Sequence, residues 1–105
     1  MGILVWLPEA VADLDRTLDA LRVRSPAAAL RLAQAVARAA RRLAEDAGLG
    51  RPLADGTGRR ELVVPLAGTG LPLRYGLDAG KVVMIGIGPE REYRGRDDRG
   101  REERG

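Results

Sequence analysis

The feature that most constrains the fold is a pair of helical apolar patterns in the first half of the chain. Apolar residues recur at intervals of three and four between positions 26 and 47, namely Ala29, Leu32, Val36, Ala40, Leu43 and Ala47. The preceding segment has the same kind of spacing at Val11, Leu14, Leu18 and Leu21. Two amphipathic helices joined by only a few residues predict an antiparallel helical hairpin.

The expected helix ends carry suitable residues. Pro8 fits the first turn of the first helix, where a missing N–H costs nothing. Ser25 is placed to cap the second helix, with Pro26 at its first position. Gly48 is the expected C-terminal stop.

Short apolar runs predict strands on both sides of this hairpin. They lie at Ile3–Leu7, Glu61–Val64, Leu71–Leu77 and Lys81–Ile87, with a turn of hairpin length at residues 78–80. The first run is expected to be a buried strand, and Pro65 is expected to end the second. The predicted fold is α+β, in the order β-α-α-β-β-β, with a small antiparallel sheet packed against the two-helix hairpin.

Individual residues in these strands carry further expectations. Trp6 is expected to be a core residue rather than an interface residue. Pro72 belongs at a sheet edge or a strand start. Gly86 and Gly88 are expected to weaken the last strand, or to mark a bulge or a close backbone approach. The Gly86–Gly88 segment lacks the helix and the lysine spacing of a phosphate-binding loop, so a nucleotide site is rejected.

The domain organisation is simple. Residues 1–93 are expected to form a single domain, and residues 94–105 a charged tail that is disordered in isolation. Neither a signal peptide nor an apolar run of membrane-spanning length is visible, so a cytoplasmic protein without membrane contact is expected.

Composition excludes several chemistries. The chain contains no cysteine and no histidine, which removes disulfides, thiol nucleophiles and imidazole acid–base catalysis, and leaves no ligands for a typical zinc site. We therefore expect neither a metal nor a cofactor.

Positive charge is concentrated in the middle of the chain. Residues 22–60 carry nine arginines against three acidic residues, a balance of +6, whereas residues 1–21 carry −3. Lys81 is the single lysine among the 18 basic residues. A GC-rich genome would explain the arginine bias without function, but a basic middle also suits a nucleic acid or an acidic protein partner.

Several local motifs together resemble the RelE/ParE family of bacterial toxins over about residues 3–93, with ParE as the nearest branch. The motifs are Trp6–Leu14, Ser25–Ala28, Gly50-Arg51-Pro52, Arg60–Pro65, Arg74-Tyr75 and Arg91-Glu92. The resemblance implies the toxin of a type II toxin–antitoxin module, bound and neutralised by a ParD-like antitoxin in a hetero-oligomer. ParE toxins act on DNA gyrase, whereas RelE toxins cut messenger RNA on the ribosome.

The resemblance also implies site residues. Target binding is assigned to Arg59, Arg60, Arg74, Arg91 and Tyr93. Antitoxin binding is assigned to Leu14, Leu18, Leu21 and Arg38. If the protein were a nuclease, its catalytic residues would be Arg74, Arg91 and Tyr93. Arg74 has a structural alternative, which is a pair with Glu61 or Asp78.

The chemistry favours the gyrase-directed alternative. A metal-free ribonuclease must activate a 2′-hydroxyl and protonate the leaving oxygen. RelE-like enzymes use lysines on the strand that reads Arg60-Glu61-Leu62-Val63-Val64 here, and this strand has no lysine. An ordinary arginine is a poor general base. A RelE-like nuclease and a family member that only binds stay open as alternatives.

Overall fold

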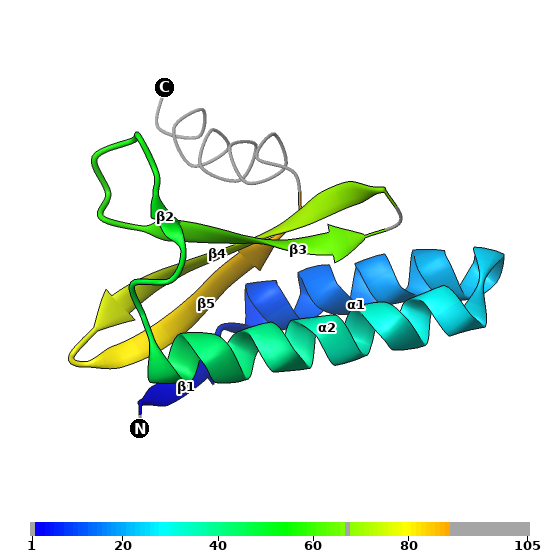
Figure 1. Cartoon of the computed structure of the whole chain (residues 1–105), viewed down its shortest axis with the longest axis horizontal. Helices are drawn as coiled ribbons and strands as arrows, with labels where there is room; N and C mark the ends of the chain where they lie inside the picture. The colour runs from blue at the N-terminus through cyan, green and yellow to red at the C-terminus, as the bar shows by residue number, and fades with distance from the viewer. Residues whose placement is uncertain (1, 67, 89–105) are drawn as a thin grey trace.

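The computed structural model describes residues 2–66 and 68–88. Within them, two helices cover one face of a five-stranded sheet (Figure 1). The elements in chain order are β1 (Ile3–Trp6), α1 (Pro8–Arg24), α2 (Pro26–Glu45), β2 (Arg51–Pro52), β3 (Arg60–Leu66), β4 (Thr69–Asp78) and β5 (Lys81–Ile87). The predicted α+β class and the helical hairpin are confirmed.

The sheet is mixed, with the strand order β1-β5-β4-β3-β2. Strands β3, β4 and β5 form the antiparallel meander that the sequence predicts. Strand β1 pairs with β5 in parallel, because the helical hairpin carries the chain back before the meander begins. The two-residue strand β2, which was not predicted, pairs with Arg60 and Glu61 at the other edge.

The helix junction follows the expected capping chemistry. The Ser25 hydroxyl accepts a hydrogen bond from the Ala28 N–H at 3.2 Å, and Pro26 occupies the first turn of α2. The helix ends at Glu45, earlier than the predicted stop at Gly48. Asp46 follows as the cap, and its carboxylate accepts a hydrogen bond from the Gly48 N–H at 3.1 Å.

Helix α1 is rotated relative to the predicted apolar stripe. Val11 was expected on the buried face but is 42% exposed, whereas Ala10 is fully buried and Asp13 is only 2% exposed. The face toward β5 therefore includes an acidic residue that the sequence pattern placed on the outside. The reason is that the Asp13 carboxylate accepts a hydrogen bond from the Ile87 N–H of β5.

Strand β1 is an edge strand rather than a fully buried one. Leu4 and Trp6 pack against the core, as expected for Trp6, while Ile3 and Val5 on the alternate positions are exposed. The prediction of a buried strand was wrong because the helices cover a single face of this strand.

Pro65 and Pro72 lie at positions where the strand is hydrogen-bonded to a neighbouring strand on one side only. Strand β3 continues through Pro65, contrary to the prediction, and β2 pairs only with Arg60 and Glu61, so the ladder on that side ends before Pro65. Pro72 lies one residue beyond the last ladder pair between β4 and β5, Leu73 with Ile87. Neither proline therefore removes a donor from a fully paired strand.

The β4–β5 hairpin has its predicted turn. Ala79 and Gly80 are the two loop residues and have φ angles of 51° and 78°, the pattern of a type I′ turn. Farther along β5, the pairs Arg74–Gly86 and Tyr75–Met84 leave out Ile85. A bulge therefore lies beside Gly86, which is one of the predicted alternatives.

A buried tyrosine ties the α2–β2 connector to the sheet. The Tyr75 hydroxyl donates to the Ala47 carbonyl at 2.7 Å and accepts from the Gly50 N–H at 2.8 Å. A Cβ atom on Gly50 would lie 2.8 Å from that hydroxyl. The Gly50-Arg51-Pro52 motif therefore begins with glycine because the backbone must approach Tyr75 closely.

The core lies between the sheet and the helices. Its buried apolar residues are Ala10, Leu18, Ala29, Leu32, Val36, Ala39, Leu43, Val64, Leu71, Leu73, Tyr75, Val82, Met84 and Ile87. In the part of the chain that the structure describes, neither helix has the length and apolar character needed to cross a membrane.

Candidate functional site

Arg74 lies on the sheet face opposite the helices. Its neighbours Leu73 and Tyr75 point into the core, and side chains alternate along a strand. The Arg74 side chain is nevertheless 1% exposed: Nη1 donates to the Gly88 carbonyl at 2.9 Å, and Nη2 lies 3.5 Å from Glu61 Oε2. The structure thus realises the Glu61 pair that was one of its predicted alternatives.

Glu61 is shared between two arginines. Its other oxygen lies 3.6 Å from Arg51 Nη2, and the Arg51 side chain is 79% exposed. Because an exposed ion pair contributes little, the buried Arg74 partner dominates the environment of this carboxylate. A role for Arg74 in target binding or catalysis stays a prediction, and a partner would have to reach a guanidinium already engaged within the sheet.

Arg60 also has an intramolecular role. Its Nη1 donates to the Gly50 carbonyl at 2.6 Å and to the Gly48 carbonyl at 3.4 Å. Together with Tyr75, this arginine holds the connector that follows α2. Its predicted contact with a target is untested.

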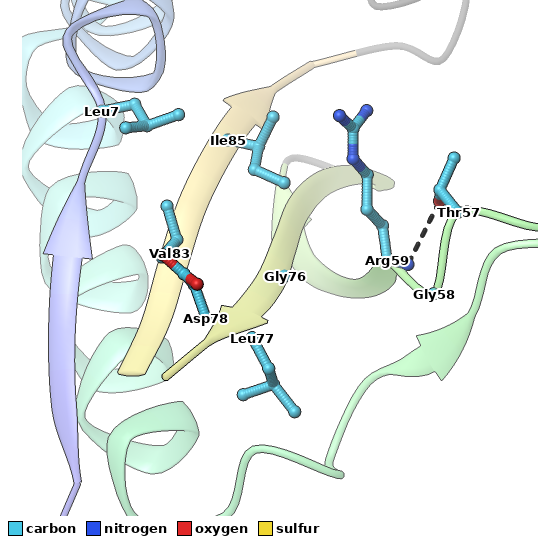
Figure 2. A pocket seen from close by; sticks show the side chains of 9 residues that line it. All are labelled: Leu7, Thr57, Gly58, Arg59, Gly76, Leu77, Asp78, Val83 and Ile85. Carbon is cyan, nitrogen blue, oxygen red and sulfur yellow. Dashed lines mark hydrogen bonds between the residues drawn. The ribbon is translucent and has the colours of Figure 1, made fainter. Parts of the chain in front are cut away.

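Arg59 lines a hollow on the sheet face that the helices leave open. The hollow has a volume of about 440 Å³ and is lined by Leu7, Thr57, Gly58, Arg59, Gly76, Leu77, Asp78, Val83 and Ile85. Figure 2 shows the Arg59 side chain alongside Ile85 and above the strand that carries Gly76. Apolar side chains with an arginine and an aspartate at the rim suit a protein surface more than a small polar substrate.

The loop that presents Arg59 is ordered by Asp55. Its carboxylate accepts hydrogen bonds from the Thr57 hydroxyl at 2.6 Å and from the Thr57 N–H at 3.1 Å. The Thr57 hydroxyl in turn accepts from the Arg59 N–H at 3.1 Å. The Thr57 hydroxyl, followed by the Thr57 N–H, lowers the pKa of Asp55 below its usual value.

We expect Thr57→Ala to raise the pKa of Asp55 toward its usual value, because the largest stabilising contact of the carboxylate is removed. NMR titration of the Asp55 side chain measures this directly. A folded-state pKa below the unfolded value means that the stabilisation is present above the unfolded pKa and is lost as the pH falls through the folded one. An unchanged midpoint in Thr57→Ala, with Thr17→Ala as the control, would contradict the assignment.

Asp13 is a buried group that the apolar spacing of α1 did not predict. Its Oδ2 accepts a hydrogen bond from the Ile87 N–H at 3.0 Å, and its Oδ1 lies 2.7 Å from Arg16 Nη2. The signal available in the sequence was slight, namely the small residue Ala10 one turn earlier. Helix α1 is thereby joined to the end of β5 by a polar contact.

The residues assigned to antitoxin binding occupy different environments. Leu18 is in the core, and Leu14 and Leu21 pack against it. Leu21 also lines a hollow of about 410 Å³ with Arg16 and Arg24 at its rim. Arg38 is exposed and lines a smaller one, about 190 Å³, between α2 and β3. Of these four residues, Leu14 and Leu21 are half-buried, Arg38 is exposed and only Leu18 is fully buried.

The remaining predicted residues, Arg91 and Tyr93, lie outside the described residues, as does the predicted tail at 94–105. Of the target-binding set, the described chain therefore brings Arg59 to an open hollow and Arg60 and Arg74 to internal partners. Arg60 and Arg74 do not line the hollow beside Arg59.

Comparison with known proteins identifies the family. The family model described as the ParE toxin of the type II toxin–antitoxin system parDE matches residues 4–93. Among solved structures, a chain of the "Chromosomal ParDE TA system from P. aeruginosa" is 24% identical, with a TM-score of 0.68 over 84% of this chain and 95% of that chain. No curated protein matches the sequence. The family match spans most of the chain, and on that basis the protein belongs to the ParE toxin family of type II toxin–antitoxin systems.

Proposed function

We propose that this protein inhibits DNA gyrase by direct binding and is neutralised by a cognate ParD-like antitoxin. The observation that carries the proposal is the match to the ParE toxin model over residues 4–93. The fold similarity to a chain of a ParDE system supports the antitoxin as partner, in a hetero-oligomer. Gyrase as the target implies that the protein works in the cytoplasm.

The chemistry of the described residues supports binding over RNA cleavage. A nuclease needs a proton acceptor, and the sequence has no histidine. Arg74, one of three nuclease candidates, is engaged by Glu61 and by the Gly88 carbonyl. The guanidinium group of arginine is a poor general base and is unsuited to take a proton from a 2′-hydroxyl.

The proposed gyrase contact is the open sheet face around Arg59, together with Arg91 and Tyr93 farther along the chain. The hollow beside Arg59 supplies apolar area from Val83 and Ile85. Apolar side chains beside an arginine are a common composition for energetically important interface positions. Arg60 and Arg74 would act there indirectly, by holding the connector and the sheet.

The proposed antitoxin contact is the helical hairpin. Leu21 and Arg38 line separate hollows beside the sheet, and arginines rim both: Arg16 and Arg24 at the first, Arg38 and Arg42 at the second. A segment with acidic and apolar residues would complement such surfaces. The two contacts use different faces of the sheet.

The decisive experiment compares the wild-type chain with Arg91→Ala in a gyrase supercoiling assay. We expect the wild type to block supercoiling and Arg91→Ala to need at least about tenfold more protein, the effect of losing one good interface contact. The matched control is Arg31→Ala, an exposed arginine of α2 that should leave potency unchanged.

The same proteins are expressed in cells while growth and transcripts are followed. Growth arrest with intact transcripts agrees with the proposal. Ribosome-dependent transcript cleavage by the wild type would replace gyrase by the RelE-like alternative. Normal growth together with undisturbed supercoiling would leave a family member that only binds.

A further inference from the structure

Strand β3 has an open edge beyond β2. On one side β3 pairs with β4 from Arg60 to Leu66, whereas on the other side β2 pairs with only the first two of these residues. Among the residues that the structure describes, no strand lies beside positions 62–66 on that side. The chain leaves the edge at Gly50, whose N–H is bonded to the Tyr75 hydroxyl at 2.8 Å.

The open edge presents backbone groups that a further strand can bind. Successive residues of a strand direct their N–H and C=O groups alternately to its two sides. The Arg59 carbonyl accepts a hydrogen bond from the Leu53 N–H at 2.9 Å on the β2 side, so the odd-numbered positions 61, 63 and 65 face that side. Val63 therefore directs an N–H and a carbonyl to the edge, and Pro65 directs only a carbonyl, because proline has no N–H.

A hollow of about 190 Å³ lies beside this edge. Its sheet wall consists of residues 62–65, which are consecutive in β3. Side chains alternate between the two faces of a sheet, so a hollow lined by consecutive residues lies along the side of the strand. The helix wall is one face of α2, with the spacing i, i+3, i+4, i+7, and consists of Ala35, Arg38, Ala39 and Arg42.

The two arginines give the hollow a positive rim. Arg38 and Arg42 are exposed, and neither belongs to an ion pair within the described part of the chain. They are one helical turn apart, which is about 6 Å along the axis of α2. Alternate residues of an extended strand are about 6.5–7 Å apart and lie on the same face. Acidic side chains at alternate positions of a strand therefore match the spacing of the two arginines.

We propose that the open edge of β3 binds an extended acidic segment of a partner protein as an additional strand. Its alternate acidic residues face Arg38 and Arg42, and the β-branched residues between them lie beside Val63, which is 50% exposed. A second copy of this chain fits less well, because symmetric pairing of two such edges brings the arginines of both copies together without acids. The inference deepens the proposed antitoxin contact, and it rests on that contact for the identity of the partner.

The first test is an NMR titration of the whole chain with a blocked seven-residue peptide of alternating glutamate and valine. The Val63 amide should exchange rapidly in the free chain and at least about tenfold more slowly at saturation, because it gains an acceptor. The Leu62 and Val64 amides face β4 and should be protected throughout, which shows that the fold is intact. An unprotected Val63 amide at saturation, or no binding at millimolar peptide, would overturn the proposal.

Two altered peptides separate strand pairing from simple charge attraction. N-methylation of the valine nitrogens removes the donors to the Val63 carbonyl and should weaken binding at least about fivefold. Glutamine in place of glutamate should weaken binding and remove most of its salt dependence. Equal binding of the N-methylated peptide would indicate a positively charged patch without strand addition. Protection of Val63 that rises with protein concentration, without peptide, would assign the edge to a second copy instead.

Substitutions on α2 test the role of the arginines. Arg42→Gln should weaken peptide binding about two- to fivefold, and the Arg38→Gln/Arg42→Gln double variant about tenfold, as expected for exposed ion pairs. The matched control is Arg41→Gln, because Arg41 is an exposed neighbour on the same helix that does not line the hollow. Equal losses for Arg41→Gln and Arg42→Gln would contradict the proposed placement of the acidic residues.

The final experiment replaces the peptide by the cognate antitoxin. The antitoxin should protect the Val63 amide and displace the peptide from the edge. An antitoxin that binds tightly but leaves the Val63 amide unprotected would overturn the assignment of this edge to it. Because no step of these measurements involves gyrase, a chain that fails to inhibit supercoiling but binds the peptide would overturn the proposed target while supporting the strand site.

Discussion

Leu73→Ala is expected to lower the free energy of unfolding by about 2–5 kcal/mol, because it removes a large side chain from a fully packed site. Leu73 is 0% exposed and lies in β4, paired with Leu62 of β3 on one side and Ile87 of β5 on the other. Small domains have a total stability of about 5–15 kcal/mol, so this change would remove a large share of it.

Urea denaturation followed by circular dichroism measures this prediction. The fluorescence of Trp6, the single tryptophan, gives a second probe because this residue packs against the core. The midpoint should fall while the slope with urea stays unchanged. The matched control is Leu77→Ala in the same strand, where the side chain is 59% exposed and the cost should be within about 0.5 kcal/mol. Equal losses in the two variants would contradict the described packing of β4.

Gly50→Ala is expected to destabilise the fold by about 1–3 kcal/mol through overpacking. The added Cβ would lie 2.7 Å from the Glu61 carbonyl oxygen and 2.8 Å from the Tyr75 hydroxyl. The Glu61 oxygen belongs to strand backbone and cannot move cheaply, so the connector would have to shift and the hydrogen bond from the Gly50 N–H to Tyr75 would be strained.

Gly48→Ala is the matched control in the same connector, because a Cβ there would meet only Asp46 Oδ1 at an ordinary 3.5 Å. Thermal unfolding of Gly50→Ala, Tyr75→Phe and their double variant then tests the mechanism. Residues in contact are not additive, so the double variant should lose less than the sum of the single losses. Additive losses, or equal losses for Gly48→Ala and Gly50→Ala, would show that the Tyr75 contact does not govern the connector.

Much of the fold follows from local patterns. The capping pair Ser25-Pro26 placed the helix junction at the observed position, and the predicted strand Lys81–Ile87 has the observed bounds. These features depend on hydrogen bonds and turn geometry among residues close in sequence. The family motifs from Trp6 to Arg91 likewise pointed to the ParE family that the comparison then confirmed.

The predictions that were wrong concern the buried face of α1 and the burial of β1, where one sequence pattern is compatible with more than one structure. The spacing of Val11, Leu14 and Leu18 defines an apolar stripe, but an apolar stripe of this width does not set the rotation of a helix to within one residue. The rotation that was adopted places Ala10 against the sheet and brings Asp13 to a backbone donor. Similarly, an apolar run such as residues 3–7 cannot tell an edge strand from a central one.

Local sequence patterns were sufficient to predict the two helices, the meander that follows them and the resemblance to a toxin family. Tertiary structure alone decided which arginines are engaged inside the protein and which lie at an open surface. Arg74 is held by a carboxylate on β3 and a carbonyl at the end of β5, and Asp13 by a peptide group 74 positions away. The periodicity of a sequence predicts which side of a helix or strand a residue occupies. Whether a charged residue can be buried on that side depends on a partner group that is distant in the sequence, and periodicity carries no information about it.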